Sequence, residues 1–384
     1  MKITKNLHFI PFKYEKVNIK FFKLFHKITK QKNEILNSLS KNYQNNYTKN
    51  LISGLKRFKF INLIGIGGSS LGALSIYKFL KKKIKINIEF FDSLNEIVIN
   101  KKNKNSLNVV ISKSGNTLET IVNSNILFQK KNNVFITENN DSYLISLANK
   151  LKATIIEHNN FIGGRYSVLS EVGMLPSELM GLDPKKFRVY DKLIKNKKFI
   201  NALLINVSNT LNLIKNKKTN SIILNYDKDS EELFFWYQQL IAESLGKEGK
   251  GVLPIISNMP RDNHSLMQLY LDGPKTNFYT FFFVDQKYKN KINNKIILKS
   301  HNYLKDKYIF DIKKSQFNAT QSVFKKAGIP FRTFIINRKD ESSLGELFCF
   351  FILETILLGQ ALGINPFNQP KVELIKKETL KNLT

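Results

Sequence analysis

The stretch Ser112–Thr120, SKSGNTLET, follows a largely apolar run at Leu107–Ile111 and precedes a helical pattern. This order predicts a strand, a turn and the start of a helix. The turn is rich in hydroxyl side chains, and free backbone N–H groups are expected where the helix begins. Such a helix start binds phosphate well, although an ordinary turn with Ser and Thr caps has the same local pattern. The stretch therefore indicates an α/β fold and a candidate phosphate site.

Short apolar runs alternate with helical stretches on both sides of this turn. The predicted strands of this first series are Ile61–Ile64, Ile84–Phe91, Asn108–Ile111, Val134–Ile136 and Thr154–Ile156. The alternation is typical of βαβ units and predicts a parallel sheet. Ligands of such sheets bind at the carboxyl ends of the strands, where the turn after Ile111 lies.

A second α/β series follows the charged segment Lys185–Lys198, which we interpret as a domain boundary. Its predicted strands are Ser221–Asn225, Val252–Ile256, Asn277–Val284 and Arg332–Ile336, and its predicted helices are Glu231–Ser244, Ser265–Leu271 and Glu346–Leu362. Lys287–Lys307 is a polar excursion between two of the strands. The sequence thus predicts an α/β protein with two doubly wound parallel-sheet domains.

The 384 residues carry a formal net charge of +31. The lysines are spread along the chain without an aromatic-interleaved basic motif, so we expect no nucleic-acid partner, although the positive field would steer an anionic substrate. The single cysteine, Cys349, excludes a disulfide framework. The apolar stretch around it is interrupted by Glu354 and predicts a buried helix. With no signal peptide evident, a cytoplasmic protein without a membrane span is expected.

The segment Gly65–Ser70, GIGGSS, has two interpretations. It opens like a dinucleotide-binding fingerprint, and Asp92 stands near the end of the next strand, where a ribose-binding acid is expected. However, Ser70 occupies the third glycine position, so the fingerprint is incomplete. The hydroxyl groups here and at Ser112–Thr120 suit a single phosphomonoester better, which makes a dehydrogenase the weaker alternative.

Four further segments carry candidate catalytic side chains. They are NNFIGGRYSVLS (159–170) with Gly164 and Arg165, ESLGK (243–247) with Glu243, DNHS (262–265) with His264, and NPFNQPKVELIK (365–376) with Gln369 and Lys376. An arginine beside a glycine turn is well suited to an oxyanion. Each segment alone also fits a structural role: a salt bridge for Arg165, and a helix-surface acid, a helix cap and a solvated tail for the other three, where the structural role is the favoured one.

Taken together, these segments resemble the phosphoglucose isomerase family. GIGGSSLG, SKSGNTLET, GGRYSVLS, ESLGKEGKG, DNHSLMQ and NPFNQPKVELIK occur in the family's order and span residues 65–376. The resemblance implies two sugar-isomerase (SIS-type) α/β domains, at 55–190 and 191–364. It also implies an N-terminal helical segment (1–54) that packs on the second domain, a C-terminal helical arm (365–384) and a homodimer.

The resemblance also implies roles for individual residues. Gly68, Ser69, Ser112, Lys113 (through its backbone), Ser114, Thr117, Gly164 and Gln369 would bind the sugar phosphate. Glu243 would be the catalytic base, and Arg165 would stabilise the enediolate. His264, reaching in from the neighbouring subunit, and Lys376 would open the sugar ring. The tail departs from the family at Asn368, Lys371 and Ile375, where Asp, Gly and Gly are more frequent.

The expected reaction is the interconversion of glucose 6-phosphate and fructose 6-phosphate. One carboxylate suffices for it, because the same base moves a proton between neighbouring carbons. No metal and no cofactor is expected, since the His and Cys residues form no cluster with ligand spacing. Two alternatives stay open: a dual phosphoglucose/phosphomannose isomerase, and a regulator that binds sugar phosphates without catalysis.

Overall fold

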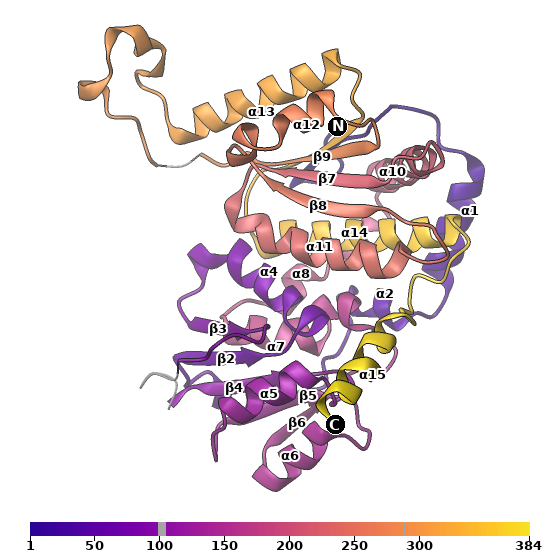
Figure 1. Cartoon of the computed structure of the whole chain (residues 1–384), viewed down its shortest axis with the longest axis vertical. Helices are drawn as coiled ribbons and strands as arrows, with labels where there is room; N and C mark the ends of the chain where they lie inside the picture. Colours follow the sequence, from indigo (N-terminus) through magenta and orange to yellow (C-terminus); the bar gives the residue numbers. More distant parts are fainter. Residues whose placement is uncertain (99–104, 288) are drawn as a thin grey trace.

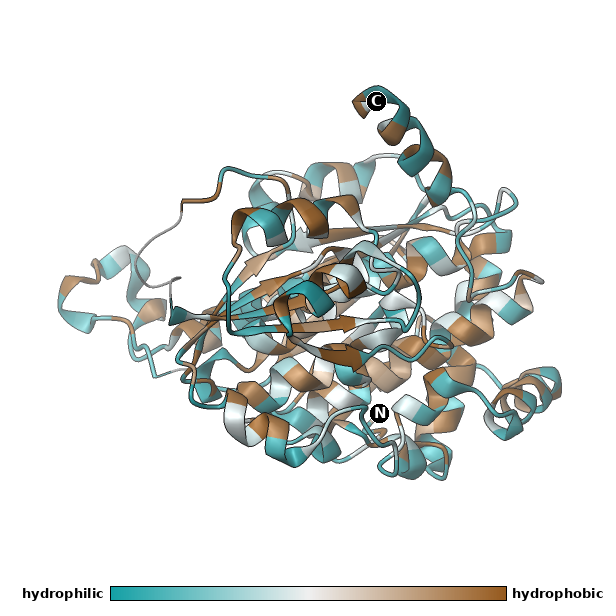
Figure 2. Cartoon of the chain, turned by 90° about the horizontal axis from the view of Figure 1, so that it is seen from below, coloured by the Kyte–Doolittle hydropathy of each residue, from teal (hydrophilic) through white to brown (hydrophobic). Residues whose placement is uncertain are grey.

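The computed structural model describes residues 1–98, 105–287 and 289–384. These residues form two five-stranded sheets with helices on both faces, stacked one above the other in Figure 1. Hydrophobic residues concentrate on the strands and on the inward faces of the helices, and hydrophilic residues on the outer turns (Figure 2). The predicted class, α/β with two doubly wound parallel-sheet domains, is confirmed.

The first sheet has the strand order β3-β2-β4-β5-β6, and all of its pairings are parallel. Its strands are β2 (Phe60–Ile64), β3 (Asn87–Phe91), β4 (Leu107–Ile111), β5 (Asn133–Thr137) and β6 (Thr154–Glu157). The chain leaves β2 for β3 on one side and returns to β4 on the other side, so the order reverses between β2 and β4. The turns after these two strands therefore lie next to each other, at the position where open α/β sheets bind ligands.

The second sheet has the order β1-β10-β9-β7-β8. Its strands are β1 (Leu7–Ile10), β7 (Asn220–Asn225), β8 (Leu253–Asn258), β9 (Asn277–Val284) and β10 (Phe331–Ile336). Only β1 is antiparallel to its neighbour, β10. The sequence did not predict β1, because a four-residue strand is too short to show a period of two.

The two domains share one continuous core. Helices α4 (Leu71–Phe79) and α7 (Glu171–Leu179) cover one face of the first sheet, and α5 (Leu118–Ile126) and α6 (Tyr143–Leu151) cover the other. In the second domain α10 (Lys197–Lys215), α11 (Glu231–Leu245) and α14 (Glu341–Ala361) face the first domain, while α12 (Met267–Asp272) and α13 (Ile309–Lys326) cover the far face (Figure 1). Packing of α4 on α11 joins the domains.

Within the described ranges, α14 is the one helix long and apolar enough to cross a membrane. However, 94% of its most apolar window is buried inside the protein. The helix even buries a charge: Glu354 pairs with Arg332 and accepts a hydrogen bond from Asn206 Nδ2 at 2.7 Å. The prediction of a buried core helix around Cys349 is confirmed, since that side chain is 0% exposed.

The N-terminal segment contacts both domains. Strand β1 belongs to the second sheet and α1 (Ile19–Lys30) packs on α10, whereas α2 (Glu34–Ser38) and α3 (Lys49–Leu55) pack on the first domain. Of these three helices, only α1 packs on the second domain. The domain boundaries at residues 54, 190 and 364 stay predictions.

The remaining elements are short connections and the C-terminal helix. They are η1 (Gly67–Ser69), η2 (Lys81–Lys83), η4 (Gly164–Leu169), α8 (Pro184–Phe187), α9 (Tyr190–Leu193), η5 (Lys228–Ser230), η6 (Arg261–His264), η7 (Asn294–Ile296), η8 (Lys299–Leu304) and α15 (Val372–Leu383). The turns η7 and η8 lie in the predicted polar excursion, which projects from the second domain after β9 (Figure 1).

Candidate active site

A close approach of two glycine turns places Arg165 beside the first sheet. Gly68 follows β2, and Gly164 begins η4. A Cβ on Gly68 would lie 2.2 Å from the carbonyl carbon of Gly164, so only glycine permits this contact. The contact fixes the η4 turn, and with it Arg165, next to the carboxyl edge of the first sheet.

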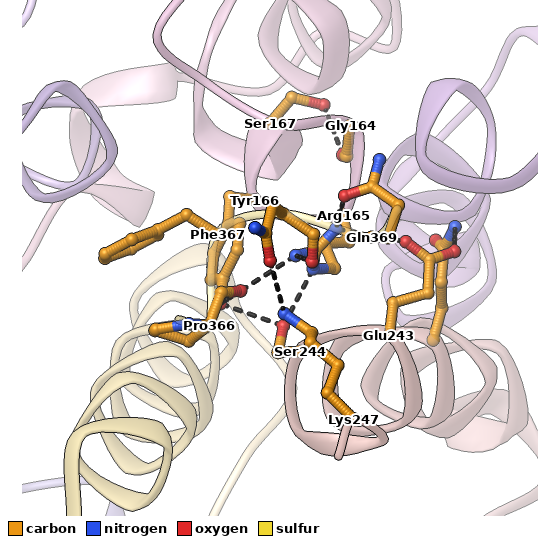
Figure 3. A network of polar contacts seen from close by, with 12 residues as sticks. Gly164, Arg165, Tyr166, Ser167, Glu243, Ser244, Lys247, Pro366, Phe367 and Gln369 are labelled. Carbon is orange, nitrogen blue, oxygen red and sulfur yellow. Dashed lines mark hydrogen bonds and ion pairs between the residues drawn. The ribbon is translucent and has the colours of Figure 1, made fainter. Parts of the chain in front are cut away.

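Arg165 is the centre of a polar network (Figure 3). Its side chain is 1% exposed, and its Nε donates to Ser244 Oγ at 2.7 Å. Its NH1 group donates to Glu243 Oε2 at 3.1 Å and to Gln369 Oε1 at 2.7 Å. Its NH2 group donates to the Pro366 carbonyl oxygen at 2.8 Å. One guanidinium thereby joins the first domain, the end of α11 and the C-terminal segment.

Glu243 stands in the last turn of α11 with both carboxylate oxygens engaged. Oε2 accepts from Arg165, and Oε1 accepts from Gln239 Nε2 at 2.8 Å. The same Nε2 atom lies 3.0 Å from where a Cβ on Gly67 would stand, so the carboxylate is next to the turn after β2. The side chain of Glu243 keeps 29% of its surface exposed. It is oriented and still open to a substrate.

The hydroxyl-rich turn after β4 lies beside the turn after β2. A Cβ on Gly65 would come within 2.8 Å of the Ile111 carbonyl oxygen. Ser112 Oγ and Thr117 Oγ1 are 2.7 Å apart, and Ser114 Oγ accepts from the backbone N–H of Asn116 at 3.3 Å. The structure thus brings these hydroxyl groups to the edge of the sheet that also carries Gly68 and Ser69.

Lys113 has a side chain that turns away from this cluster. Its Nζ donates to the Asn160 carbonyl oxygen at 2.9 Å and lies 3.3 Å from Glu138 Oε1. The side chain is therefore already paired. Its carbonyl oxygen accepts from the backbone N–H of Glu138 at 3.0 Å. A substrate contact through the backbone of Lys113 would therefore use its N–H group, and that role stays a prediction.

The segment before α15 closes the network from the other side. The carbonyl oxygen of Asn368 accepts a hydrogen bond from Arg165 NH2 at 3.3 Å. Its side-chain Oδ1 accepts from Lys247 Nζ at 3.0 Å, and Lys247 also donates to the Asn365 carbonyl oxygen. Burial and then the charge of Arg165 lower the pKa of Lys247. The family departure at Asn368 is thus accommodated by a local hydrogen bond.

His264 is not part of this cluster. Helix α11 runs antiparallel to β8: Glu231 accepts from Asn258 Nδ2 at 2.5 Å at one end, and Gln238 donates to the Pro254 carbonyl oxygen at 2.7 Å towards the other. Glu243 consequently lies beyond the amino end of β8 and His264 beyond its carboxyl end. The six residues of β8 at ~3.3 Å each separate them by roughly 20 Å. Within one chain the two side chains do not meet.

Lys376 is not brought to the cluster either. It lies on α15, which has no buried residues, and its side chain is 57% exposed. Its Nζ donates to Glu373 Oε1 at 2.7 Å. In this structure the ammonium group is held on the surface of its own helix.

Sequence reasoning missed several members of the network: Gln239, Ser244, Lys247 and Tyr166. Gln239 stands four residues before Glu243, a spacing that places both on one face of a helix. Tyr166 OH donates to the Pro366 carbonyl oxygen at 3.0 Å and lies 2.9 Å from Ser244 Oγ. No sequence signal links Tyr166 to Ser244, because the two residues come from different domains.

Across residues 1–98, 105–287 and 289–384, no three His, Cys, Asp or Glu side chains gather closely enough to hold a metal ion. What the cluster offers chemically is therefore one carboxylate, one guanidinium and a set of hydroxyl and amide donors. Such a set can move a proton and stabilise an anion.

Comparison with known proteins identifies the family. The model of the family described as phosphoglucose isomerase matches residues 30–382. The chain belongs to the phosphoglucose isomerase family. Membership makes it an enzyme of the isomerase class, and the resemblance inferred from the sequence is confirmed.

Individual relatives agree with this family. A glucose-6-phosphate isomerase of Mycoplasmopsis pulmonis is 34% identical over 84% of this chain and 82% of its own length. One from Methanocaldococcus jannaschii is 33% identical over 86% of each chain.

Solved structures share the fold at lower sequence identity. A hypothetical protein of Thermus thermophilus superposes with a TM-score of 0.82 at 21% identity, over 95% of this chain and 94% of its own. A glucose-6-phosphate isomerase of Chlamydia trachomatis gives a TM-score of 0.68 at 19% identity, over 91% of this chain and 73% of its own. The fold of this chain is therefore that of two SIS-type α/β domains, as the sequence predicted.

Proposed function

We propose that this chain interconverts glucose 6-phosphate and fructose 6-phosphate through an enediolate, with Glu243 as the general base. One observation carries the proposal: a partly exposed carboxylate, held by Arg165 NH1 at 3.1 Å, stands beside the glycine turn after β2. A protein that only binds sugar phosphates needs the hydroxyl-lined turn but not this carboxylate.

The phosphate of the substrate would bind the two adjacent turns at the carboxyl edge of the first sheet. Ser112, Ser114 and Thr117 supply hydroxyl donors there, and Ser69 and the backbone of Gly68 lie on the neighbouring turn. The phosphate is remote from the reacting carbons, so its binding energy orients the open-chain sugar. The net charge of +31 favours the approach of a dianion.

Proton transfer would be the task of Glu243. The carboxylate removes the proton from C2 of the aldose and returns it to C1, which yields the ketose without a second base. Gln239 and Arg165 each hold one of its oxygens, so its orientation is fixed before the substrate binds. Positioned general-base catalysis contributes typically ~10²–10⁴-fold in rate.

Arg165 would stabilise the negative charge of the enediolate. Its guanidinium is buried and held in place by Ser244 and the Pro366 carbonyl oxygen. Its NH1 group would donate to the enediolate by exchanging one of its present partners, Glu243 or Gln369. A preorganised donor to an oxyanion is worth about 2.7–4 kcal/mol in the transition state. Gln369, on the same NH1 group, would contact the sugar.

Ring opening would require a second copy of the chain. Within one chain, Glu243 and His264 lie beyond opposite ends of β8. A site that contains both side chains must therefore take His264 from a partner. The projecting segment after β9 starts at the same edge of the second sheet as His264. Its side chains Ile296 and Leu298 are 78% and 72% exposed, which favours burial against a partner. A homodimer is therefore part of the proposal.

We propose Lys376 as the second ring-opening group, and this role rests on the family resemblance alone. Its present partner is Glu373, so this role requires α15 to occupy a different position over the site. The cytoplasm is the proposed location, on the grounds given with the sequence.

A coupled assay of the purified protein tests the function. We expect turnover of glucose 6-phosphate that is unchanged by a chelator, because no step uses a metal. Comparable turnover of mannose 6-phosphate would establish the dual isomerase instead. Binding of either sugar phosphate without turnover would establish the regulator and overturn the proposed reaction.

A further inference from the structure

The amino-terminal edge of the first sheet, opposite the candidate active site, carries a concentration of positive charge. Two adjoining hollows of about 250 and 690 Å³ run along this edge, from the start of β3 to the start of β6. We define the basic edge as the Lys and Arg residues that line them: Lys56, Arg57, Lys59, Lys83, Lys85, Lys130, Lys131 and Lys152. Among the described residues, no carboxylate lines either hollow.

This concentration is not a uniform consequence of the net charge. The opposite edge of the same sheet carries acidic side chains after its strands, among them Asp92, Glu138 and Glu157, and its Lys113 is paired with Glu138. On the basic edge, Lys83 is the one side chain with a carboxylate partner in the described part of the chain, Glu341 at 2.8 Å. The remaining positive charges are left to bind an external anion.

Aromatic rings are interleaved with these charges. Lys56–Phe60 reads KRFKF, and its last residue begins β2. Phe58 lines both hollows and Phe60 lines the larger one. The Arg57 guanidinium lies 5.0 Å from the centre of the Phe58 ring. Both rings are half-buried, so they form part of the floor rather than protrude from it.

We propose that the basic edge binds single-stranded nucleic acid. Basic grooves with aromatic floors track a phosphate backbone and stack its bases. Five strands about 4.8 Å apart make the edge roughly 19 Å wide, which spans several nucleotides. An anionic membrane is the weaker occupant, because a bilayer is flat and recessed rings cannot insert into it. From the sequence we expect no nucleic-acid partner, because the lysines are spread along the chain and no aromatic-interleaved basic motif is recognised. That prediction overlooks KRFKF at Lys56–Phe60, which is such a motif, and the fold brings the separate lysines together around it.

Two triple variants with equal charge change test the proposal. The first is Lys56→Glu/Lys59→Glu/Lys85→Glu on the basic edge. The matched control is Lys23→Glu/Lys27→Glu/Lys325→Glu, three exposed lysines of α1 and α13. The probe is a fluorescent oligouridylate of about 12 nucleotides, within the range of known single-strand site sizes. Isomerase activity of both variants reports that each still folds.

The unmodified protein should bind the probe at ~0.15 M salt, and binding should weaken as the salt concentration rises. The first variant should bind the probe on the order of 10-fold more weakly, because three phosphate contacts are lost. For the same reason, the slope of log K against log salt concentration should become less steep by about 2. The control variant should lose less than about twofold, since its lysines do not line the groove. Phe58→Leu should weaken binding roughly fivefold through lost stacking.

Four results would overturn the proposal. They are no binding of the probe at this salt concentration, equal losses in the two triple variants, equal affinity for a duplex of the same length, and preferential binding to phosphatidylserine vesicles. The second result would assign the attraction to net charge alone. The last would assign the edge to a membrane surface.

Discussion

The NH1 group of Arg165 lies 3.1 Å from Glu243 Oε2, although 78 positions separate the two residues in the chain. Arg165 follows the first sheet and Glu243 ends a helix of the second domain. Their contact spans the domain boundary, so the proposed catalytic pair exists only when both domains are folded and docked. Any change that separates the domains should abolish turnover before it unfolds either sheet.

Replacing Glu243 by glutamine should remove the base and leave the fold intact. Glutamine has the same shape and can still accept a hydrogen bond from Arg165. We expect kcat to fall by about 10²–10⁴-fold, with the melting temperature almost unchanged. The matched control is Glu248→Gln, because Glu248 is 65% exposed and pairs only with Lys250. Turnover near wild type in Glu243→Gln would disprove the proposed mechanism.

Replacing Arg165 by lysine tests the anion-stabilising role. Lysine keeps the charge but cannot donate to Ser244, Glu243 and the Pro366 carbonyl oxygen from one planar group. We expect kcat to fall by about 10²–10³-fold, as for the loss of one oxyanion donor, and thermal stability to decrease. Arg338→Lys is the control, since Arg338 is 57% exposed. Equal effects in the two variants would contradict a specific role of Arg165.

Mixing two inactive variants tests whether His264 comes from a partner. If it does, hybrids of Glu243→Gln with His264→Ala contain one intact site and one doubly changed site. After random reassociation, about a quarter of wild-type activity should return, because half of the dimers are hybrids with one active site each.

The control for this experiment is a mixture of Glu243→Gln with Arg165→Lys. Both residues belong to the site of their own chain, so every site in such hybrids stays damaged. No activity should return. Recovery in the control, or none in the His264→Ala mixture, would show that His264 is not shared between subunits.

Glu346 on α14 should make stability depend on pH. Burial raises its pKa to about 7, while hydrogen bonds from Thr4 at 2.5 Å and Asn6 at 3.1 Å oppose the rise. The pKa of Glu346 is higher in the folded protein than in the unfolded chain, so the folded state favours the protonated carboxyl group. The contribution of Glu346 to the free energy of unfolding is therefore complete below about pH 4.5 and is lost as the pH rises through 7. The size of this loss is on the order of 3 kcal/mol.

Glu346→Gln should remove this dependence. Relative to wild type, the variant should gain free energy of unfolding between pH 5 and pH 8, as measured by urea denaturation. The difference in free energy between the variant and wild type reports Glu346 alone, because other titrating groups are present in both proteins. One such group is His158, since burial lowers its pKa to about 4. As a control, Glu373→Gln on the exposed helix α15 should differ from wild type by the same free energy of unfolding at every pH. A constant difference between Glu346→Gln and wild type would reject the assignment.

The α/β class could be predicted because alternating apolar and helical patterns are local. The strands β4, β5 and β7 and the helices α5 and α14 appear close to their predicted bounds. The strand β1 and the helices α10 and α13 were not predicted. Only the first two residues of α10, Lys197 and Lys198, fall in the predicted charged boundary, and the rest of the helix received no prediction. Packing of its apolar face against α14 decides its structure.

The sequence by itself determined the family, the fold class and the identity of the candidate catalytic residues, because these depend on short motifs and their order. Tertiary structure alone decided which of them meet. It joined Arg165 to Glu243 and Gln369, separated His264 from Glu243 by the length of β8, left Lys376 on the surface, and gathered scattered lysines at one sheet edge. The physical reason is that strand order and helix packing set distances between residues, and neither is written in any local stretch of the chain.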